Sequence, residues 1–353
     1  EAALNQSIQN LEYNISSVIH KLTNQTRAKI AFIEGHGELT DIELAGATKV
    51  LEEYYSIERV KIDGQISSLT QRTVIDSLNV RIKNKYEAIV IAKPMHPFEE
   101  KDKFIIDQFI MHGGKVLWFI DPVFATMDSL QNSDQTVGVV NDINISDQLF
   151  RYGARLNSNL IMDLQAIPIP IVTGMTGGQP QTNFLPWYFF PLLTPAGNHP
   201  IVNNIDAVMG HFSSSVDMIE TNEVKKTILL SSSQYSRVVN TPVLISLEIL
   251  KQEPEPSLYQ QSFQPVAVLL EGEFESLFRN RIPPEIADDH SIGFIEESEK
   301  TMMLIVADGD IIRNQIHLSQ KQPLPLGFDQ FTRRQFGNNE FLLNAMNYMC
   351  DET

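Results

Sequence analysis

Apolar and polar residues follow one another along the first half of the chain in blocks that predict strands alternating with helices. Helical spacing of apolar positions covers 41–54 and 99–111, and Gly113-Gly114 predicts the end of the second helix. Strands that alternate with helices are typical of a parallel sheet with helices on both faces. The predicted strands are short, mostly apolar runs at 29–34 (KIAFIE), 56–62, 86–92 (YEAIVIA) and 115–120 (KVLWFI).

The same pattern returns near the end of the sequence. Residues 302–307 (MMLIVA) predict another buried strand, and the apolar spacing at 338–349 predicts a final helix. We expect residues 301–353 to form a βα unit that completes the α/β domain of residues 26–165. The predicted fold class is α/β, with a mostly parallel, doubly wound sheet of glutamine-amidotransferase-like or flavodoxin-like type and an added β-rich region.

The first 25 residues have a different period. Apolar residues recur at spacings of four and three, which predicts an amphipathic linker helix over 1–25 with a heptad seam. Such a helix packs on its own domain or serves as a stalk or dimerisation helix. The flanking positions are mostly polar and uncharged, so they carry no charge pattern that selects a coiled-coil partner. The seam residues are Leu4, Ile8, Leu11, Ile15, Val18 and Leu22.

Residues 166–300 depart from the α/β pattern. Seven prolines between 168 and 200 predict an irregular loop, because proline is excluded from helices and central strands. Strand-like runs further along the segment predict a β-rich insertion. Trp187, Tyr188 and Phe189 form an aromatic cluster within the proline-rich part. They serve either as a core plug that anchors the loop or as an exposed patch that binds a partner.

Composition and charge limit the function classes. The chain has 353 residues, 42% of them hydrophobic and 20% charged, which is typical of a globular protein. A net charge of −17 argues against binding to nucleic acid or to anionic membranes. A single cysteine, Cys350, excludes an internal disulfide and fits both the cytoplasm and the periplasm. No apolar run is long enough to span a membrane, and the sequence reads as a soluble piece of a longer protein.

Recognised catalytic and nucleotide-binding motifs are missing from the sequence. It has no P-loop, no GxGxxG turn between a strand and a helix, no GxSxG elbow and no cysteine or histidine pair with metal-ligand spacing. Polar side chains do follow four of the predicted strands, where open α/β sheets bind their ligands. They can hold a sugar, a peptide or an ion, or merely cap the strands. We predict no cofactor and no resident metal. The candidate ligand-binding residues are His36, Glu38, Lys93, Asp121, Asp308 and Asp310.

Several short strings, spread in order over about residues 28–353, resemble the GldG family of gliding-motility proteins. They include KIAFIEGHGE (29–38), Lys93-Pro94, DQFIM (107–111), GGKVLW (113–118), Asp121-Pro122, FRYG (150–153), Asp308-Gly309-Asp310, Pro325-Leu326-Gly327 and GNN (337–339) followed by FLLN (341–344).

The resemblance implies a role, a location and partners. The family is an auxiliary, often called substrate-binding, component of an ABC-type transporter. Its members are anchored in the inner membrane, with the soluble part in the periplasm. The implied partners are the permease GldF and the ATPase GldA. The soluble region is similar to a domain shared with intraflagellar-transport proteins. The resemblance also implies membrane helices and a further soluble segment outside this sequence, and it supplies no catalytic residue.

We therefore expect a non-enzymatic, periplasmic accessory subunit of an ABC-type transporter complex involved in gliding motility. The alternative is a glycan- or peptide-binding module that uses the crevice at the strand ends. A third hypothesis is a hydrolase that uses two carboxylates, for example Glu38 and Asp310, which would have to lie roughly 5–9.5 Å apart.

Overall fold

A computed structural model describes residues 27–350 apart from 76–79, 131–132, 177–178, 222–223 and 288. The helix predicted over residues 1–25 lies outside these described residues. Within them, the predicted strands near residues 29, 56, 86, 115 and 302 are all present, as are the helices that begin near residues 41, 100 and 338.

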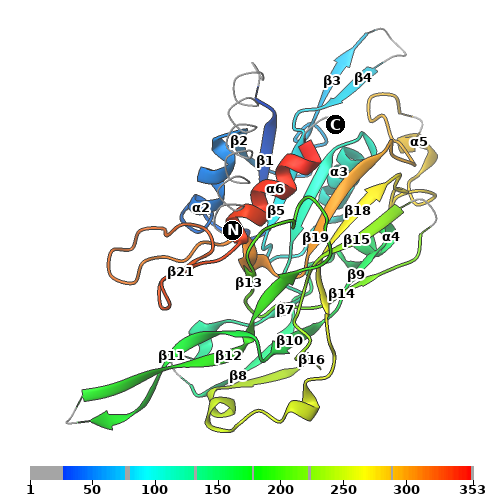
Figure 1. Ribbon diagram of the computed structural model, residues 1–353. Helices are drawn as coiled ribbons and strands as arrows, with labels where there is room; N and C mark the ends of the chain where they lie inside the picture. Colours follow the sequence, from blue (N-terminus) through cyan, green and yellow to red (C-terminus); the bar gives the residue numbers. More distant parts are fainter. Residues whose placement is uncertain are drawn as a thin grey trace.

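One large sheet of ten strands runs through the molecule (Figure 1). One half of this sheet is parallel, in the order β2-β1-β5-β6-β19. Its central strands are almost entirely buried because helices cover both faces. The strands are β1 (Lys29–Glu34), β2 (Ser56–Lys61), β5 (Ala88–Ala92), β6 (Lys115–Phe119) and β19 (Thr301–Val306).

The other half of the sheet is antiparallel and continues from β19 in the order β18-β15-β12-β11. The protein is therefore a mixed α/β fold with one large mixed sheet and few helices. The mostly parallel sheet that the sequence predicts is limited to the first half, and the doubly wound, flavodoxin-like description stays a prediction. These strands are β18 (Pro265–Gly272), β15 (Val224–Ser231), β12 (Gln179–Pro195) and β11 (Ala166–Thr176), with β13 (Val208–Met209) paired to β12.

Helices pack on the two faces of the parallel half. α2 (Asp41–Glu52) and α6 (Asn338–Cys350) place apolar side chains in the core on one face. α3 (Glu100–Met111) and α4 (Ser146–Tyr152) do so on the other face. A capping box between Thr40 and Glu43 begins α2. α3 ends at Met111, and Gly113 follows its C-cap residue His112 with the positive φ of 81° that is expected of a C-terminal glycine.

Smaller elements complete the structure. A three-stranded sheet, β17-β8-β7, lies near the β11–β12 hairpin at the lower end of the molecule in Figure 1. Its strands are β7 (Val123–Phe124), β8 (Gln135–Val140) and β17 (Val243–Ser246). Two-stranded pairs are β3 (Thr70–Val74) with β4 (Val80–Asn84), β9 (Ala154–Leu156) with β14 (Val216–Met218), β10 (Asn159–Asp163) with β16 (Ser236–Asn240), and β20 (Phe328–Asp329) with β21 (Arg334–Gln335). Short helices are α5 (Pro284–Ala287), η1 (Met127–Leu130), η2 (Leu247–Lys251), η3 (Pro256–Leu258) and η4 (Gly309–Ile312).

The irregular loop predicted for the proline-rich segment is wrong, because β11 and β12 form a long hairpin there. β11 is an edge strand, and Pro168 lies opposite Pro186, so the missing N–H groups fall together at one position of the ladder. Register shifts next to Pro168 mark a bulge or irregularity at this end of the pair. Edge strands and bulges are among the places where a sheet accepts proline.

The aromatic cluster is part of the core. Trp187 is fully buried, Tyr188 and Phe189 are nearly so, and all three belong to a third hydrophobic cluster between the hairpin and its neighbouring strands. Phe189 and Phe212 pack with their ring centroids 6.0 Å apart. The interpretation of this cluster as an exposed partner-binding patch is therefore wrong, and the core-plug interpretation fits the burial.

Among the described residues, every helix is too short or too polar to cross a bilayer.

Candidate functional site

The four candidate residues that follow β5, β6 and β19 lie together. Lys93 extends its ammonium group between two carboxylates, with Nζ 2.9 Å from Oδ2 of Asp121 and 2.6 Å from Oδ2 of Asp310. The three strands are adjacent and parallel, so their carboxyl ends bring these side chains to one edge of the sheet. Lys93 has a φ of 55°, a left-handed conformation that is uncommon for a residue other than glycine.

Asp308 forms the floor of this cluster and is fully buried. Its carboxylate accepts hydrogen bonds from the backbone N–H of His211 at 2.8 Å, from Oγ of Ser213 at 2.5 Å and from the N–H of Asp310 at 2.9 Å. Asp121 accepts a hydrogen bond from the N–H of Gly309. Carboxylate oxygens of Asp121, Asp308 and Asp310 all lie within 4.8 Å of one another.

Burial and charge separate the pKa values of these groups. Burial raises the pKa of Asp308 well above its usual value, and the neighbouring carboxylates add to the effect. Burial also works to raise the pKa of Asp310, but Lys93, His211 and Arg313 outweigh it and lower that pKa to about 2. Burial alone lowers the pKa of Lys93, whereas its two carboxylate partners raise it above its ordinary value. Lys93 is therefore a permanent cation at neutral pH.

Two further members of the cluster, Arg313 and His211, are not among the candidate residues from the sequence. Arg313 bridges Asp310, at 3.3 Å, and Glu43 on α2, at 2.7 Å. His211 belongs to the segment after β13, and burial lowers its pKa to about 4. Both residues come from segments without a recognisable motif. Arg313 could have been suspected, because it follows Asp310 by three residues within one short turn.

His36 and Glu38 form a second cluster with a residue that the sequence analysis missed. The imidazole of His36 lies between two carboxylates, with Nδ1 3.2 Å from Glu38 and Nε2 3.0 Å from Asp102 on α3. The ring stacks on Phe98 with a centroid distance of 3.8 Å. Burial alone lowers the pKa of His36, but Glu38 and Asp102 raise it above its usual value.

A cavity of about 310 Å³ opens beside the second cluster. The guanidinium of Arg59 is already held there by Glu34, by Asp41 at 3.2 Å and by the carbonyl of Leu39 at 2.8 Å. Glu38 is nearly buried and already bonded to His36. The cavity wall is therefore polar but internally paired. Its lining residues are Glu34, Gly35, Gly37, Glu38, Thr40, Asp41 and Arg59.

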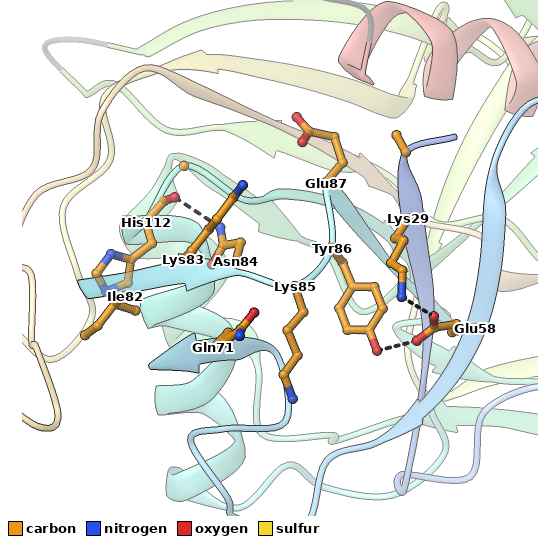
Figure 2. A pocket seen from close by; sticks show the side chains of 12 residues that line it. Lys29, Glu58, Gln71, Ile82, Lys83, Asn84, Lys85, Tyr86, Glu87 and His112 are labelled. Atoms are coloured by element: carbon orange, nitrogen blue, oxygen red, sulfur yellow. Dashed lines mark hydrogen bonds and ion pairs between the residues drawn. The ribbon is translucent and has the colours of Figure 1, made fainter. Parts of the chain in front are cut away.

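A larger cavity, of about 840 Å³, lies at the opposite, amino ends of the parallel strands. Figure 2 shows Lys29, Tyr86 and Glu58 on one side of it and the strand β4 with His112 on the other. Nζ of Lys29 and the hydroxyl of Tyr86 both donate to Glu58, at 2.8 Å each. None of the candidate residues from the sequence lies in this cavity.

The charged side chains at the strand ends pair with one another, and we call this arrangement a closed charge network. Three carboxylates at this spacing resemble the oxygen ligands of a divalent cation. Here, however, the ammonium group of Lys93 already supplies positive charge to two of them. The fold and these clusters define an α/β protein whose strand-end groups are paired with one another.

Comparison with known proteins identifies the family. The model of the family described as ABC-type uncharacterized transport system matches residues 27–345, and the chain belongs to this family. The members of this family are auxiliary components of ABC-type transport systems.

Individual relatives add little beyond the family. An uncharacterized protein of Borreliella burgdorferi is 24% identical over 279 residues, which cover 78% of this chain and 51% of the relative. The chain thus spans about half the length of the curated relative it matches. Among solved structures, the mmIFT52 N-terminal domain aligns with a TM-score of 0.49 at 10% identity, covering 92% of this chain and 98% of that one. A ThuA-like protein of Parabacteroides merdae aligns with a TM-score of 0.39 at 11% identity, covering 92% and 90%.

Proposed function

We propose that this protein is a non-enzymatic accessory subunit of an ABC-type transporter complex, anchored in the inner membrane with the described region in the periplasm. Its proposed partners are a GldF-like permease and a GldA-like ATPase, and its proposed process is gliding motility. The observation that carries the proposal is the match of the transport-system family to residues 27–345.

The pairing of the charged groups at the strand ends supports a role that does not involve catalysis. A general acid or base needs a titratable group that is free to exchange a proton with a substrate. Asp310 and Asp121 are instead paired with Lys93, and Asp308 is buried beneath them with its hydrogen bonds satisfied. A hydrolytic pair formed by Glu38 and Asp310 is not favoured either, because each carboxylate is already paired within its own cluster, Glu38 with His36 and Asp310 with Lys93.

A second candidate function is the binding of a glycan or a peptide at the strand ends. The cavity of about 310 Å³ beside Glu38 favours it, because several carboxylates and two glycines border that space. Carboxylates suit hydroxyl-rich or amine-bearing ligands, and glycines allow a ligand to approach the backbone closely. This module would serve the same complex by presenting a ligand to the permease.

The test of the first proposal is purification of the full-length protein from detergent-solubilised membranes, followed by mass spectrometry. We expect a permease and an ATPase of one ABC-type system in constant ratio to the protein. Recovery of the protein alone, under conditions in which other membrane complexes of the same cells stay intact, would refute the proposal.

The ligand hypothesis has an independent assay. Melting temperatures of wild type and of Thr40→Val are compared across a panel of cell-wall glycan fragments and peptides. Thr40 lines the cavity and also caps α2, so its replacement can change stability by itself. The melting temperatures of the two proteins without ligand are therefore measured first, and each ligand-induced shift is taken relative to its own protein. A fragment that raises the melting temperature of wild type more than that of the variant supports binding in the cavity. An equal or absent response in both proteins counts against it.

A further inference from the structure

The three-stranded sheet β17-β8-β7 presents an apolar outer face to solvent. Val137 and Val139 are two apart on β8 and so point to the same face. Leu244 lies directly opposite Val137, and Phe124 lies directly opposite Val139. Residues directly opposite in an antiparallel pair share a face, so all four side chains form one stripe across the three strands. We call these four residues the outer apolar stripe.

Every residue of the outer apolar stripe is exposed. Between 46% and 63% of the surface of each of its four residues is open to solvent. The inner face of the same sheet is also apolar, because Val123, Val243 and Ile245 are buried in the core around Trp187. In an antiparallel sheet with one face exposed to solvent, apolar and polar residues normally alternate along each strand. A contiguous apolar surface on a second face is typical of an interaction site.

The surroundings of the stripe are acidic. Asp134 and Asp142 flank β8 and are both exposed. Glu248, just after β17, is exposed and pairs with Lys251 at 2.5 Å. The stretch between Lys115 and Arg151 contains no lysine or arginine, but two of its five aspartates, Asp121 and Asp147, pair with Lys93 and Lys103. The border of the stripe therefore consists of Asp134, Asp142 and Glu248, with Lys251 as the cation beside Glu248. The stripe is therefore an apolar centre inside a negatively charged border.

We propose that the outer apolar stripe is the docking surface for a partner protein segment that carries apolar side chains flanked by lysine or arginine. This inference rests on the proposed role as a subunit of a transporter complex and names the surface by which it joins that complex. The acidic border attracts a basic partner and speeds its encounter. The same border repels an anionic membrane and opposes pairing of the stripe with a second copy of this chain.

The test compares full-length wild type with the triple variant Val137→Thr, Val139→Thr, Leu244→Thr. Threonine keeps the β-branched shape at the valine positions and a high strand propensity at all three, so the sheet is expected to persist. The matched control is Val74→Thr, an exposed valine of β3 that is not in the three-stranded sheet. We expect the triple variant to recover at least tenfold less permease and ATPase from solubilised membranes, and the control to recover wild-type amounts. Equal melting temperatures verify that all three proteins are folded.

A photo-crosslinking residue placed at Leu244 identifies the occupant. Crosslinks to a transporter-subunit peptide that has apolar residues between lysines or arginines support the proposal, as does weaker recovery by Asp134→Asn, Asp142→Asn. Crosslinks between two copies of this chain, or binding to anionic vesicles that the triple variant loses, would overturn it. Normal recovery of the transporter by the triple variant would overturn it while leaving the proposed function intact. No recovery by wild type refutes the proposed function itself.

Discussion

Replacing Lys93 by methionine tests whether the strand-end cluster is a closed charge network. The side chain of Lys93 is 13% exposed, and those of its partners Asp121 and Asp310 are 7% and 12% exposed. Removing one partner of a buried ion pair typically costs about 3–5 kcal/mol, because the remaining charges stay buried without compensation. Since about 1.4 kcal/mol is a tenfold change, the folding equilibrium should fall roughly 100- to 4,000-fold.

The assay is urea denaturation at pH 7, with Lys29→Met as the matched control. Lys29 also pairs with a carboxylate, Glu58, but its side chain is 56% exposed. An exposed pair is worth at most about 1 kcal/mol, so the control should stay close to wild type. A Lys93→Met variant that also stays within about 1 kcal/mol of wild type would refute the reasoning.

The pH dependence of the same comparison has a defined sign. The pKa of Asp310 is about 2 in the folded protein, below its ordinary value of 3.8. A carboxylate with a lowered folded pKa contributes stability that is present above the unfolded pKa and lost as the pH falls through the folded value. The deficit of Lys93→Met should therefore narrow as the pH drops below about 4. A deficit that grows in acid would contradict the assigned ion pair.

Three further changes have defined expectations. His211 has a pKa of about 4 in the folded protein, below its ordinary value of 6.5, so the free energy of unfolding should fall as the pH drops from 6.5 to 4. His211→Phe should reduce this fall by up to about 3 kcal/mol in denaturation measured across that pH range, and an unchanged fall would refute the assignment. Trp187→Ala should cost about 3–5 kcal/mol in urea denaturation because the side chain is fully buried, whereas the half-exposed Phe184→Ala should cost less; equal costs would contradict the core-plug role. Gly46→Ala should cost about 1–3 kcal/mol, because its Cβ would lie 2.8 Å from the backbone N of Leu326, whereas Gly174→Ala meets nothing within 4 Å and should change little; the melting temperatures of the two variants decide.

The sequence predicted the parallel half of the sheet and part of the site for the same physical reason. Short, wholly apolar runs are characteristic of strands buried on both faces, and the carboxyl ends of parallel neighbours meet at one edge. Lys93, Asp121 and Asp310 could therefore be expected to lie together before any coordinates were seen. The periodicity of apolar residues does not show that Lys93 pairs with both aspartates. Lys93 has a left-handed backbone conformation, which the apolar pattern does not reveal, and its ammonium group lies between the carboxylates of Asp121 and Asp310.

The failures of prediction have physical causes too. Proline is excluded from helices and central strands, but an edge hairpin tolerates it where the ladder needs no donor, as at Pro168 opposite Pro186. His211 and Asp102 reach their clusters from distant segments, and a single sequence does not show which distant segments come together. The pairing partners of His36 and Asp308 were therefore missed.

Charge is distributed unevenly over this molecule, and the distribution separates two kinds of surface. At the strand ends, Lys93 and Arg313 neutralise carboxylates within the chain, so little charge is left there for a ligand. Around β8, Asp134 and Asp142 lie in the stretch between Lys115 and Arg151, which contains no lysine or arginine, and the apolar stripe between them is open. Buried charge pairs position the strand ends, whereas a net negative charge around an apolar surface attracts a partner of opposite charge. Association with the transport system is therefore expected to be sensitive to changes on β8 and insensitive to exposed changes elsewhere on the α/β half.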